Sequence, residues 1–453
     1  MKNLLKSLSL ALFVAATLLT QSAHIQTSLP SDTIPATSPS PHFCKAIGGP
    51  ENEWGESLIQ TADGGYAIAG TTTSFGAGEW DVYVVKLDAN GNLQWTKTIG
   101  GKNWEEGKSL IQTSDGGYAI AGYTNSFGAG YADVYVVKLD ANGNLQWTKT
   151  IGGPGDEIGK SLIQTSDGGY AIAGETKSFG AGRRDVYVVK LDANGNLQWT
   201  KTIGGKNDDA GISLIQTSDG GYAIASITES FGAGGADVYV VKLDANGNLQ
   251  WTKTIGGPES EIGSSLIQTS DGGYAIAGAT ISFGAGSGDV YVVKLDANGN
   301  LQWTKTIGGP ESEIGSSLIQ TSNGGYAIAG YTQSFGAGSG DVYVVKLDAN
   351  GNLQWTKTIS AKNKNYSKSS LIQTSDGGYA IAGHTESFGA GGDDVYVVKL
   401  DRNGDACCAV SQTSQVGSGG RLGSPTSSIG SGCTLTSPNP STSSGGTLTN
   451  QCP

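Results

Sequence analysis

The sequence is poor in the side chains that most often carry enzyme chemistry. Its histidines are His24, His42 and His384, and its arginines are Arg183, Arg184, Arg402 and Arg421. Only His384 lies in a loop of the repeated part of the chain, and a histidine in such a loop is more often solvated than catalytic. The arginines are too few and too clustered for an active site built on an arginine triad. Two loop carboxylates could hydrolyse a glycoside, but no feature of the sequence selects such a pair.

Long apolar runs are also missing, with one exception near the start. The run from about residue 8 to 19 follows Lys2 and Lys6, which is typical of a signal peptide, predicted over 1–23. A linker rich in Pro, Ser and Thr follows over 24–41. No later segment is apolar enough to span a bilayer, and no cysteine precedes Cys44, which argues against a lipid-anchored start. We therefore expect an exported protein, secreted or at the cell surface, without a membrane span.

Basic residues are outnumbered, with 28 Lys and Arg against 40 Asp and Glu and a net charge of −12. An acidic surface repels nucleic acid and anionic lipid, so we expect neither as a partner. The chain has five cysteines, all outside the repeat described next. An odd number leaves at least one thiol without a partner in the same chain.

Glycine and repetition are what the chain has in abundance. The stretch "DVYVVKLDANGNLQWTKTI" starts at Asp81 and recurs in further copies every 52 residues, and a broken seventh copy starts at Asp394. Periods of this size indicate repeat folds. In the first copy, segments 57–61, 66–72, 81–87 and 93–99 are rich in Val, Ile, Tyr, Thr and Trp, which favours strands. No segment has the apolar spacing of a helix.

The connections indicate how these strands pair. "SDGG" and "DANGN" supply the positive φ of hairpin turns, whereas the other two connections of each copy are longer. Four antiparallel strands repeated seven times predict an all-β, seven-bladed propeller over 42–410. A parallel β-helix is the main alternative, but its coils are shorter and do not use hairpin turns. The repeated tryptophan, Trp95 in the first copy, is interpreted as packing between blades.

The repeat resembles a known family. "DVYVVKLDANGNLQWTKTIGG", followed by an acid, a Gly and "SLIQTSDGGYAIAGYT", is similar to the SBBP repeats of secreted bacterial and archaeal seven-bladed propellers, over roughly 43–405. The resemblance implies the fold and no catalytic residue. A fainter likeness is to the blades of pyrroloquinoline-quinone enzymes, where a Trp also follows a Gly by four residues, as Trp95 follows Gly91. The preceding Asp-to-Gly spacing is one residue shorter here.

Differences between the copies fall almost entirely in the two longer connections, which propeller geometry places on one face. Varied loops on a rigid ring are where propellers usually bind partners, and aromatic and Arg residues are favoured anchors. The alternative is drift in loops that are free to vary. The candidate binding residues for an unknown protein or glycan are Trp54, Trp80, Trp104, Tyr123, Tyr131, Arg183, Arg184, Tyr331 and His384.

A second candidate site is a set of acids placed four residues after the "GG" of each unit. Six carboxylates ahead of the innermost strands could ring one mouth of the channel and hold Ca²⁺. The preferred alternative is that each carboxylate accepts backbone N–H bonds and ties a loop, so that no cofactor is required. The acids are Glu53, Glu105, Glu157, Asp209, Glu261 and Glu313.

The two ends of the repeat region predict how the ring closes. "FCKAIGG" matches "WTKTIGG" position by position, with Phe43 in the Trp place and Ile47 in the Ile place. We expect this N-terminal strand to complete the seventh blade, with a disulfide from Cys44 to Cys408, or to Cys407. The alternative is that "ACCAV" forms the last outer strand and the N-terminal segment stays loose.

The remaining segment, 411–453, is rich in Ser, Gly and Thr and predicts a flexible tail. A short knot stapled by Cys433 and Cys452 is the alternative. The sequence as a whole favours a monomeric, non-catalytic binding or surface-interaction module. The alternative is a secreted propeller enzyme, either a polysaccharide hydrolase or a quinone-type oxidoreductase.

Overall fold

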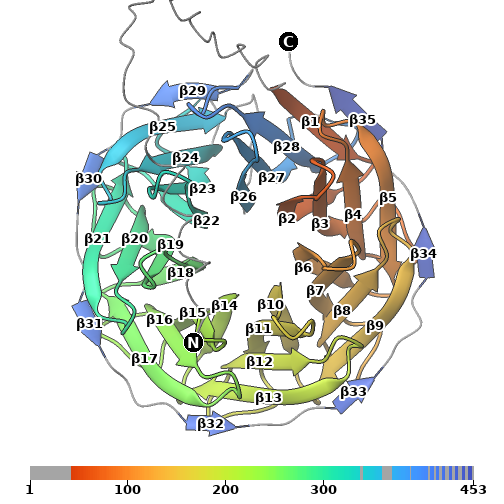
Figure 1. Ribbon diagram of the computed structural model, residues 1–453, viewed down its shortest axis with the longest axis horizontal. Coiled ribbons are helices and arrows are strands. Elements are labelled where there is room, and N and C mark those ends of the chain that lie inside the picture. The colour runs from red at the N-terminus through yellow and green to blue at the C-terminus, as the bar shows by residue number, and fades with distance from the viewer. Residues whose placement is uncertain are drawn as a thin grey trace, which may run out of the picture. The chain divides into compact units, whose positions relative to one another are not determined.

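The repeated segments form strands in all seven copies, and the strands assemble as blades around one axis (Figure 1). The computed structural model describes residues 42–336, 340–359, 370–387 and 389–406, and the backbone of seven short segments between 409 and 450. Within these residues every element is a strand. The all-β, seven-bladed prediction is confirmed.

Each blade has four main strands, which are hydrogen-bonded in order from the axis outward. The innermost strands are β2 (Glu53–Gln60), β6 (Glu105–Gln112), β10 (Glu157–Gln164), β14 (Asp209–Gln216), β18 (Glu261–Gln268), β22 (Glu313–Gln320) and β26 (Ser370–Gln373). The second strands are β3 (Tyr66–Thr72), β7 (Tyr118–Thr124), β11 (Tyr170–Thr176), β15 (Tyr222–Thr228), β19 (Tyr274–Thr280), β23 (Tyr326–Thr332) and β27 (Tyr379–Thr385). The third strands are β4 (Asp81–Leu87), β8 (Asp133–Leu139), β12 (Asp185–Leu191), β16 (Asp237–Leu243), β20 (Asp289–Leu295), β24 (Asp341–Leu347) and β28 (Asp394–Leu400). The fourth strands are β5 (Leu93–Gly100), β9 (Leu145–Gly152), β13 (Leu197–Gly204), β17 (Leu249–Gly256), β21 (Leu301–Gly308), β25 (Leu353–Ile359) and β1 (Phe43–Gly48).

The hairpin turns use the residues that the sequence singled out. Gly64 and Gly91 have φ values of 81° and 76°, which only glycine adopts without strain. Asp63 accepts a hydrogen bond from the Thr61 hydroxyl at 2.5 Å, and Asp88 accepts backbone N–H groups of its own turn at 2.8 Å. These local bonds fix the register of the strands on either side.

The innermost strand is longer than predicted. In blade 1 it starts at Glu53 rather than at 57, because pairing with β3 continues through a register shift between Gly55 and Ser57. A glycine at such a bulge lets the strand bend without losing its partner. The extension places the acid itself at the first position of the strand.

The hydrophobic core lies between neighbouring blades. The third strands are buried along their whole length, and the Tyr83 side chain of β4 is 1% exposed. Trp95 of blade 1 meets Tyr118 of blade 2 edge to face, with ring centroids 5.7 Å apart. The repeated Trp therefore packs between blades, as the sequence indicated, and each such pair contributes about 0.5–1.5 kcal/mol beyond its buried area.

The ring closes through the N-terminal strand. β1 pairs antiparallel with β28, with Phe43 opposite Lys399 and Ile47 opposite Val395, which is the register of Trp95 and Ile99 against β4 in blade 1. Phe43 contacts Tyr66 of the next blade at 5.7 Å, as Trp95 contacts Tyr118. The closure prediction is confirmed, and the alternative with "ACCAV" as the outer strand of blade 7 is wrong.

Cys44 lies in β1 opposite Val398 and is disulfide-bonded. The two partners expected from the sequence, Cys407 and Cys408, lie outside the described residues. The identity of the bonded pair therefore stays a prediction. Cys433 and Cys452, and with them the alternative of a stapled knot, also lie outside the described residues, as do the predicted signal peptide and linker over 1–41.

The tail differs from the expected flexible segment, because seven short stretches of it add a fifth strand to each blade (Figure 1). We call these stretches the belt. It visits the blades in reverse order, from blade 6 back through blade 1 and on to blade 7. Its strands are β29 (Ala409–Gln412), β30 (Gln415–Gly417), β31 (Arg421–Gly423), β32 (Ser428–Gly430), β33 (Thr434–Thr436), β34 (Ser441–Ser443) and β35 (Thr447–Asn450).

Candidate functional site

The two longer connections of each unit meet on one face, as expected. Residues just before the third strand form isolated parallel bridges with residues just before the next innermost strand, for example Trp80 with Trp104 and Ala132 with Asp156. The bridges place the varied positions of one blade beside those of the next. This face is called the variable face below.

Three tryptophans of the variable face stack in a row. The ring centroids of Trp54 and Trp80 are 5.0 Å apart, and those of Trp80 and Trp104 are 5.5 Å apart. The Trp54 indole donates to Asp393 of blade 7 at 2.9 Å, and the Trp104 indole donates to Glu79. Both polar ends of the row are therefore tied down, which holds the rings in place.

The exposed end of the row borders a hollow. Trp104 is 43% exposed and Tyr131 is 80% exposed, whereas most large apolar side chains of the ring are buried. With Glu79, Asn103 and Asn125 they line a cavity of about 340 Å³. An aromatic wall with amide and carboxylate groups can receive both the apolar and the hydrogen-bonding parts of a partner.

A charged network lies beside the row. Lys108 contacts Glu56 at 3.1 Å and also Glu106, which accepts a hydrogen bond from the Tyr123 hydroxyl. Burial opposes the charged form of Lys108, but the two carboxylates outweigh it and raise the pKa of the ammonium group. Burial of Tyr123, aided by Glu106, raises the pKa of its phenol. These groups are mutually satisfied and rigid.

In blade 3 a similar pairing involves an expected site residue. Arg184 lies 3.4 Å from Glu175, which also pairs with Lys160 at 2.6 Å. Arg183 next to it is exposed. The arginines therefore differ, because one belongs to an ion-pair network and the other faces solvent.

The structure brings together most, but not all, of the expected binding residues. Trp54, Trp80, Trp104 and Tyr131 form the row and hollow. Burial lowers the pKa of His384 in blade 7, and Asp393, which accepts the Trp54 indole N–H, opposes that effect. Tyr331 stands apart in blade 6, where its ring packs over Gly340.

Sequence reasoning missed the acids that anchor the row. Asp393 lies one residue before the third strand of blade 7 and Glu79 lies two residues before the third strand of blade 1, and each accepts an indole N–H. Both positions are among those that vary between copies. The signal that could have identified them is the coincidence of a varied acid with a varied Trp in the following connection.

The six acids of the possible cation ring are all fully buried rather than exposed at a channel mouth. The Glu53 carboxylate accepts the backbone N–H of Gly49 at 2.5 Å and the hydroxyl of Thr72 at 2.7 Å. These are the bonds of the loop-tying alternative. Among the described residues, no group of three or more His, Cys, Asp or Glu side chains is arranged to hold a metal ion.

Each of these acids faces a second buried acid from the preceding blade. A Cβ added at Gly100 would lie 2.1 Å from Asp81 Oδ1 and 2.6 Å from Glu105 Oε2, so both carboxylates crowd the same glycine. Asp81 Oδ2 accepts the N–H groups of Ala77 and Gly78 at 3.1 Å. Burial, and secondarily Glu105, raise the pKa of Asp81 to about 6.

Comparison with known proteins places these features in context. A curated relative, the regulatory protein FlaEY of Caulobacter vibrioides, is 26% identical over 266 residues, which is 51% of this chain but 28% of that protein. A structure of an unknown-function protein from Dyadobacter fermentans is 11% identical with a TM-score of 0.46, covering 79% of this chain and 97% of the other. An ulvan lyase of polysaccharide lyase family PL25 is 13% identical with a TM-score of 0.49, covering 83% and 98%.

Two family models match the repeats. A model described as a β-propeller domain of unknown function matches residues 61–93. A second, described as outer membrane protein assembly factor BamB, matches residues 81–317 and again 132–432. None of the described residues forms an apolar helix of membrane-spanning length. The second model covers more than half of the chain, which therefore belongs to this family of β-propeller repeat proteins.

Proposed function

We propose that the protein is an exported, monomeric, non-catalytic module that binds a protein or glycan through the variable face, and that its repeats are of the SBBP type. The observation that carries the proposal is the stacked row Trp54–Trp80–Trp104 beside the hollow lined by Tyr131. Exposed aromatic side chains on a rigid support are favoured contact anchors because little conformational entropy is lost on binding.

The likeness to a regulatory protein supports a binding role in general terms, since regulation requires a partner. The likeness covers 28% of that relative. Experiment is needed to identify the partner. Glycan-array screening and capture from the native cell surface would provide candidates. Turnover of a glycoside or a quinone-linked dye by the purified protein would overturn the non-catalytic assignment.

The double variant Trp104→Ala/Tyr131→Ala tests the face directly. Both side chains are exposed, so we expect the melting temperature to stay within about 2 °C of wild type, while affinity for a captured partner falls at least tenfold. Ile281→Ala is the matched control, because Ile281 is 57% exposed on the variable face of blade 5, away from the row. Equal affinity of the double variant and wild type would remove this surface as the binding site.

A further inference from the structure

The face opposite the variable face repeats the same turns, and the same ion pair lies beneath them in six blades. A lysine of the third strand reaches the aspartate of the "DGG" hairpin in the same blade at 2.9–3.0 Å. These lysines are nearly buried, with side chains 4% exposed, so the aspartate supplies their counter-charge. The pairs are Lys86–Asp63, Lys138–Asp115, Lys190–Asp167, Lys242–Asp219, Lys294–Asp271 and Lys399–Asp376.

Blade 6 lacks the acid, because its hairpin reads "SNGG". Asn323 Oδ1 accepts bonds from the Thr321 hydroxyl at 2.6 Å and the Gly325 N–H at 3.3 Å, as the aspartates do elsewhere. In the other blades the second carboxylate oxygen of the aspartate accepts from the lysine. In Asn323 that place is taken by the amide nitrogen, which is a donor and cannot accept a bond from Lys346. Lys346 remains 4% exposed as a residue and hydrogen-bonds the Leu347 carbonyl at 2.8 Å, without an ion pair among the described side chains. Burial lowers the pKa of Lys346.

Blade 7 adds a basic residue, Arg402, next to the Asn323 hairpin of blade 6. Its second hairpin reads "DRNG" where the six other blades have "DANG". The exposed Arg402 guanidinium donates to the Asp376 carbonyl at 3.2 Å. Compared with the equivalent junctions between other blades, this one has lost a negative charge at Asn323 and gained a positive charge at Arg402. It has also gained Asp405 in place of the repeated Asn, but that carboxylate is paired with Lys357 at 2.7 Å.

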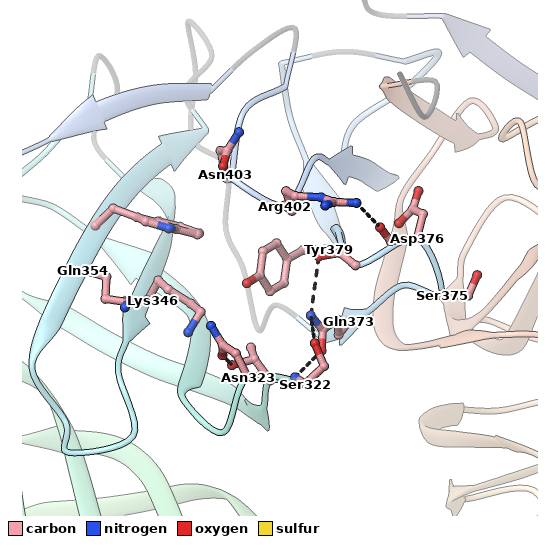
Figure 2. Close-up of a pocket in the computed structure, with 13 residues that line it drawn as sticks. Ser322, Asn323, Lys346, Gln354, Gln373, Ser375, Asp376, Tyr379, Arg402 and Asn403 are labelled. Carbon is pink, nitrogen blue, oxygen red and sulfur yellow. Dashed lines mark hydrogen bonds between the residues drawn. The ribbon is translucent and has the colours of Figure 1, made fainter. Parts of the chain in front are cut away.

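Asn323 and Arg402, which differ from the repeat, both line one cavity of about 560 Å³ between blades 6 and 7. Figure 2 shows the side-chain nitrogen atoms of Lys346 and Asn323 directed to the same space beside Tyr379, with Arg402 above. The amides of Gln354 and Gln373 and the ring of Trp355 complete the lining. A volume of this size suits a small metabolite or one sugar unit.

We propose that this cavity binds an oxyanion, a carboxylate or a phosphate, carried on a polyhydroxylated molecule such as an acidic sugar. The Lys346 ammonium and the Asn323 amide converge as donors without an acceptor between them, and an anionic oxygen satisfies both. The glutamine amides can hydrogen-bond hydroxyl groups, and the aromatic rings can contact the carbon face of a sugar. This site is separate from the variable face and does not depend on the function proposed for it.

Calorimetric titration of the full chain tests the proposal with D-glucuronate, glucose 6-phosphate, inorganic phosphate and neutral glucose. We expect one molecule of glucuronate or glucose 6-phosphate to bind per chain, and glucose at least tenfold more weakly. The two acidic sugars distinguish carboxylate from phosphate as the preferred group. Binding of phosphate as tight as that of both sugars would overturn recognition of the carrier, and no binding by any anion would overturn the site.

Asn323→Asp is the decisive variant, because it restores the residue found in the other six blades and so should fold. The new carboxylate pairs with Lys346, and we expect anion affinity to fall at least tenfold with no loss of melting temperature. Lys346→Met should weaken binding similarly. Unchanged affinity in a folded Asn323→Asp variant would contradict the proposal.

The repeat also permits a gain of function. The double substitution Asp219→Asn/Ala297→Arg reproduces both departures at the junction of blades 4 and 5, where Lys242 takes the place of Lys346. We expect the stoichiometry of anion binding to rise from one to two. A stoichiometry that stays at one would show that these two residues do not define the site.

Discussion

At the scale of single residues, the least expected feature is the row of buried acid pairs between blades. Asp394 and Glu53 repeat at the closing blade what Asp81 and Glu105 do in the first, and burial raises the pKa of Asp394 to about 6. Sequence comparison identified the member of each pair that precedes an innermost strand and predicted its loop-tying bonds, because six of the seven copies carry that acid. It did not show that they pair across blades, since that contact depends on the closed ring.

The pairs predict a pH dependence of stability. The pKa of Asp81 rises from an ordinary 3.8 to about 6 on folding, so its contribution is complete below about pH 4 and is lost as pH rises through about 6. Asp81→Asn keeps an acceptor for the backbone N–H groups and removes the like-charge contact. We expect the variant to gain about 1–2 kcal/mol relative to wild type between pH 5 and 8, in urea unfolding across this range.

Glu51→Gln is the charge-matched control, because Glu51 is exposed. Its stability should follow that of wild type at each pH. A difference between Asp81→Asn and wild type that does not change with pH would refute the paired-acid explanation.

At the scale of strands, the sequence predicted the second and third strands of the first blade at their observed bounds. In both strands, β-branched and aromatic residues lie between clear turn sequences, so the sequence leaves little doubt about where each strand begins and ends. The innermost strand was underestimated because a glycine bulge interrupts its pattern but not its pairing. The anion pocket was missed because the comparison of copies concentrated on the long connections, where most of the variation lies.

The closing strand β1 offers a prediction at this scale. Phe43 is 4% exposed and fills the place of the repeated Trp, so Phe43→Ala should lower the free energy of unfolding by about 3–5 kcal/mol. Phe43→Trp should remain within about 1 kcal/mol of wild type, because the six equivalent sites already hold Trp beside the same turn glycine. Urea denaturation measures both, and a Trp variant as unstable as the Ala variant would contradict the equivalence of the seven sites.

At the scale of the whole molecule, the belt was the largest departure from expectation. A Ser- and Gly-rich segment cannot form a core of its own, and composition alone therefore predicts flexibility. Three-residue strands become stable only against an existing edge. The signal overlooked was spacing, since an apolar residue recurs every six or seven positions at Val410, Val416, Leu422, Ile429 and Leu435, and again thirteen positions on at Leu448.

The register explains that spacing. Leu422 lies opposite Ile255 and Ile429 opposite Ile203, and the other apolar positions after Val410 likewise match the isoleucine of a fourth strand. Val410 lies opposite Thr358, one residue away from this register. Leu422→Asp/Ile429→Asp should release the belt at blades 3 and 4 and raise hydrogen exchange there at least tenfold. Uncovered edges should also promote association, detectable by light scattering.

A charge-matched control, Ser411→Asp/Ser443→Asp, places the acids in belt strands away from these apolar positions and should leave exchange at blades 3 and 4 as in wild type. Equal exchange in wild type and the Leu422→Asp/Ile429→Asp variant would show that the belt does not hold these edges.

The disulfide of Cys44 gives a prediction about the ends of the ring. Peptide mapping without reduction should recover Cys44 joined to Cys408, or to Cys407, closing a loop of roughly 360 residues. By the chain-entropy estimate such a bond adds about 6 kcal/mol of stability, less any strain. Recovery of Cys44 as a free thiol would sink the pairing.

The closing blade also limits the order in which strands can pair during synthesis. β1 is translated before any complete blade, yet its partners β28 and β35 are the last main strand and the last belt strand to be made. β1 cannot pair with either partner until that partner has been made. Closure is thus the last step in assembling the ring, which suits a protein proposed to be exported, because an open ring can cross a membrane before it closes.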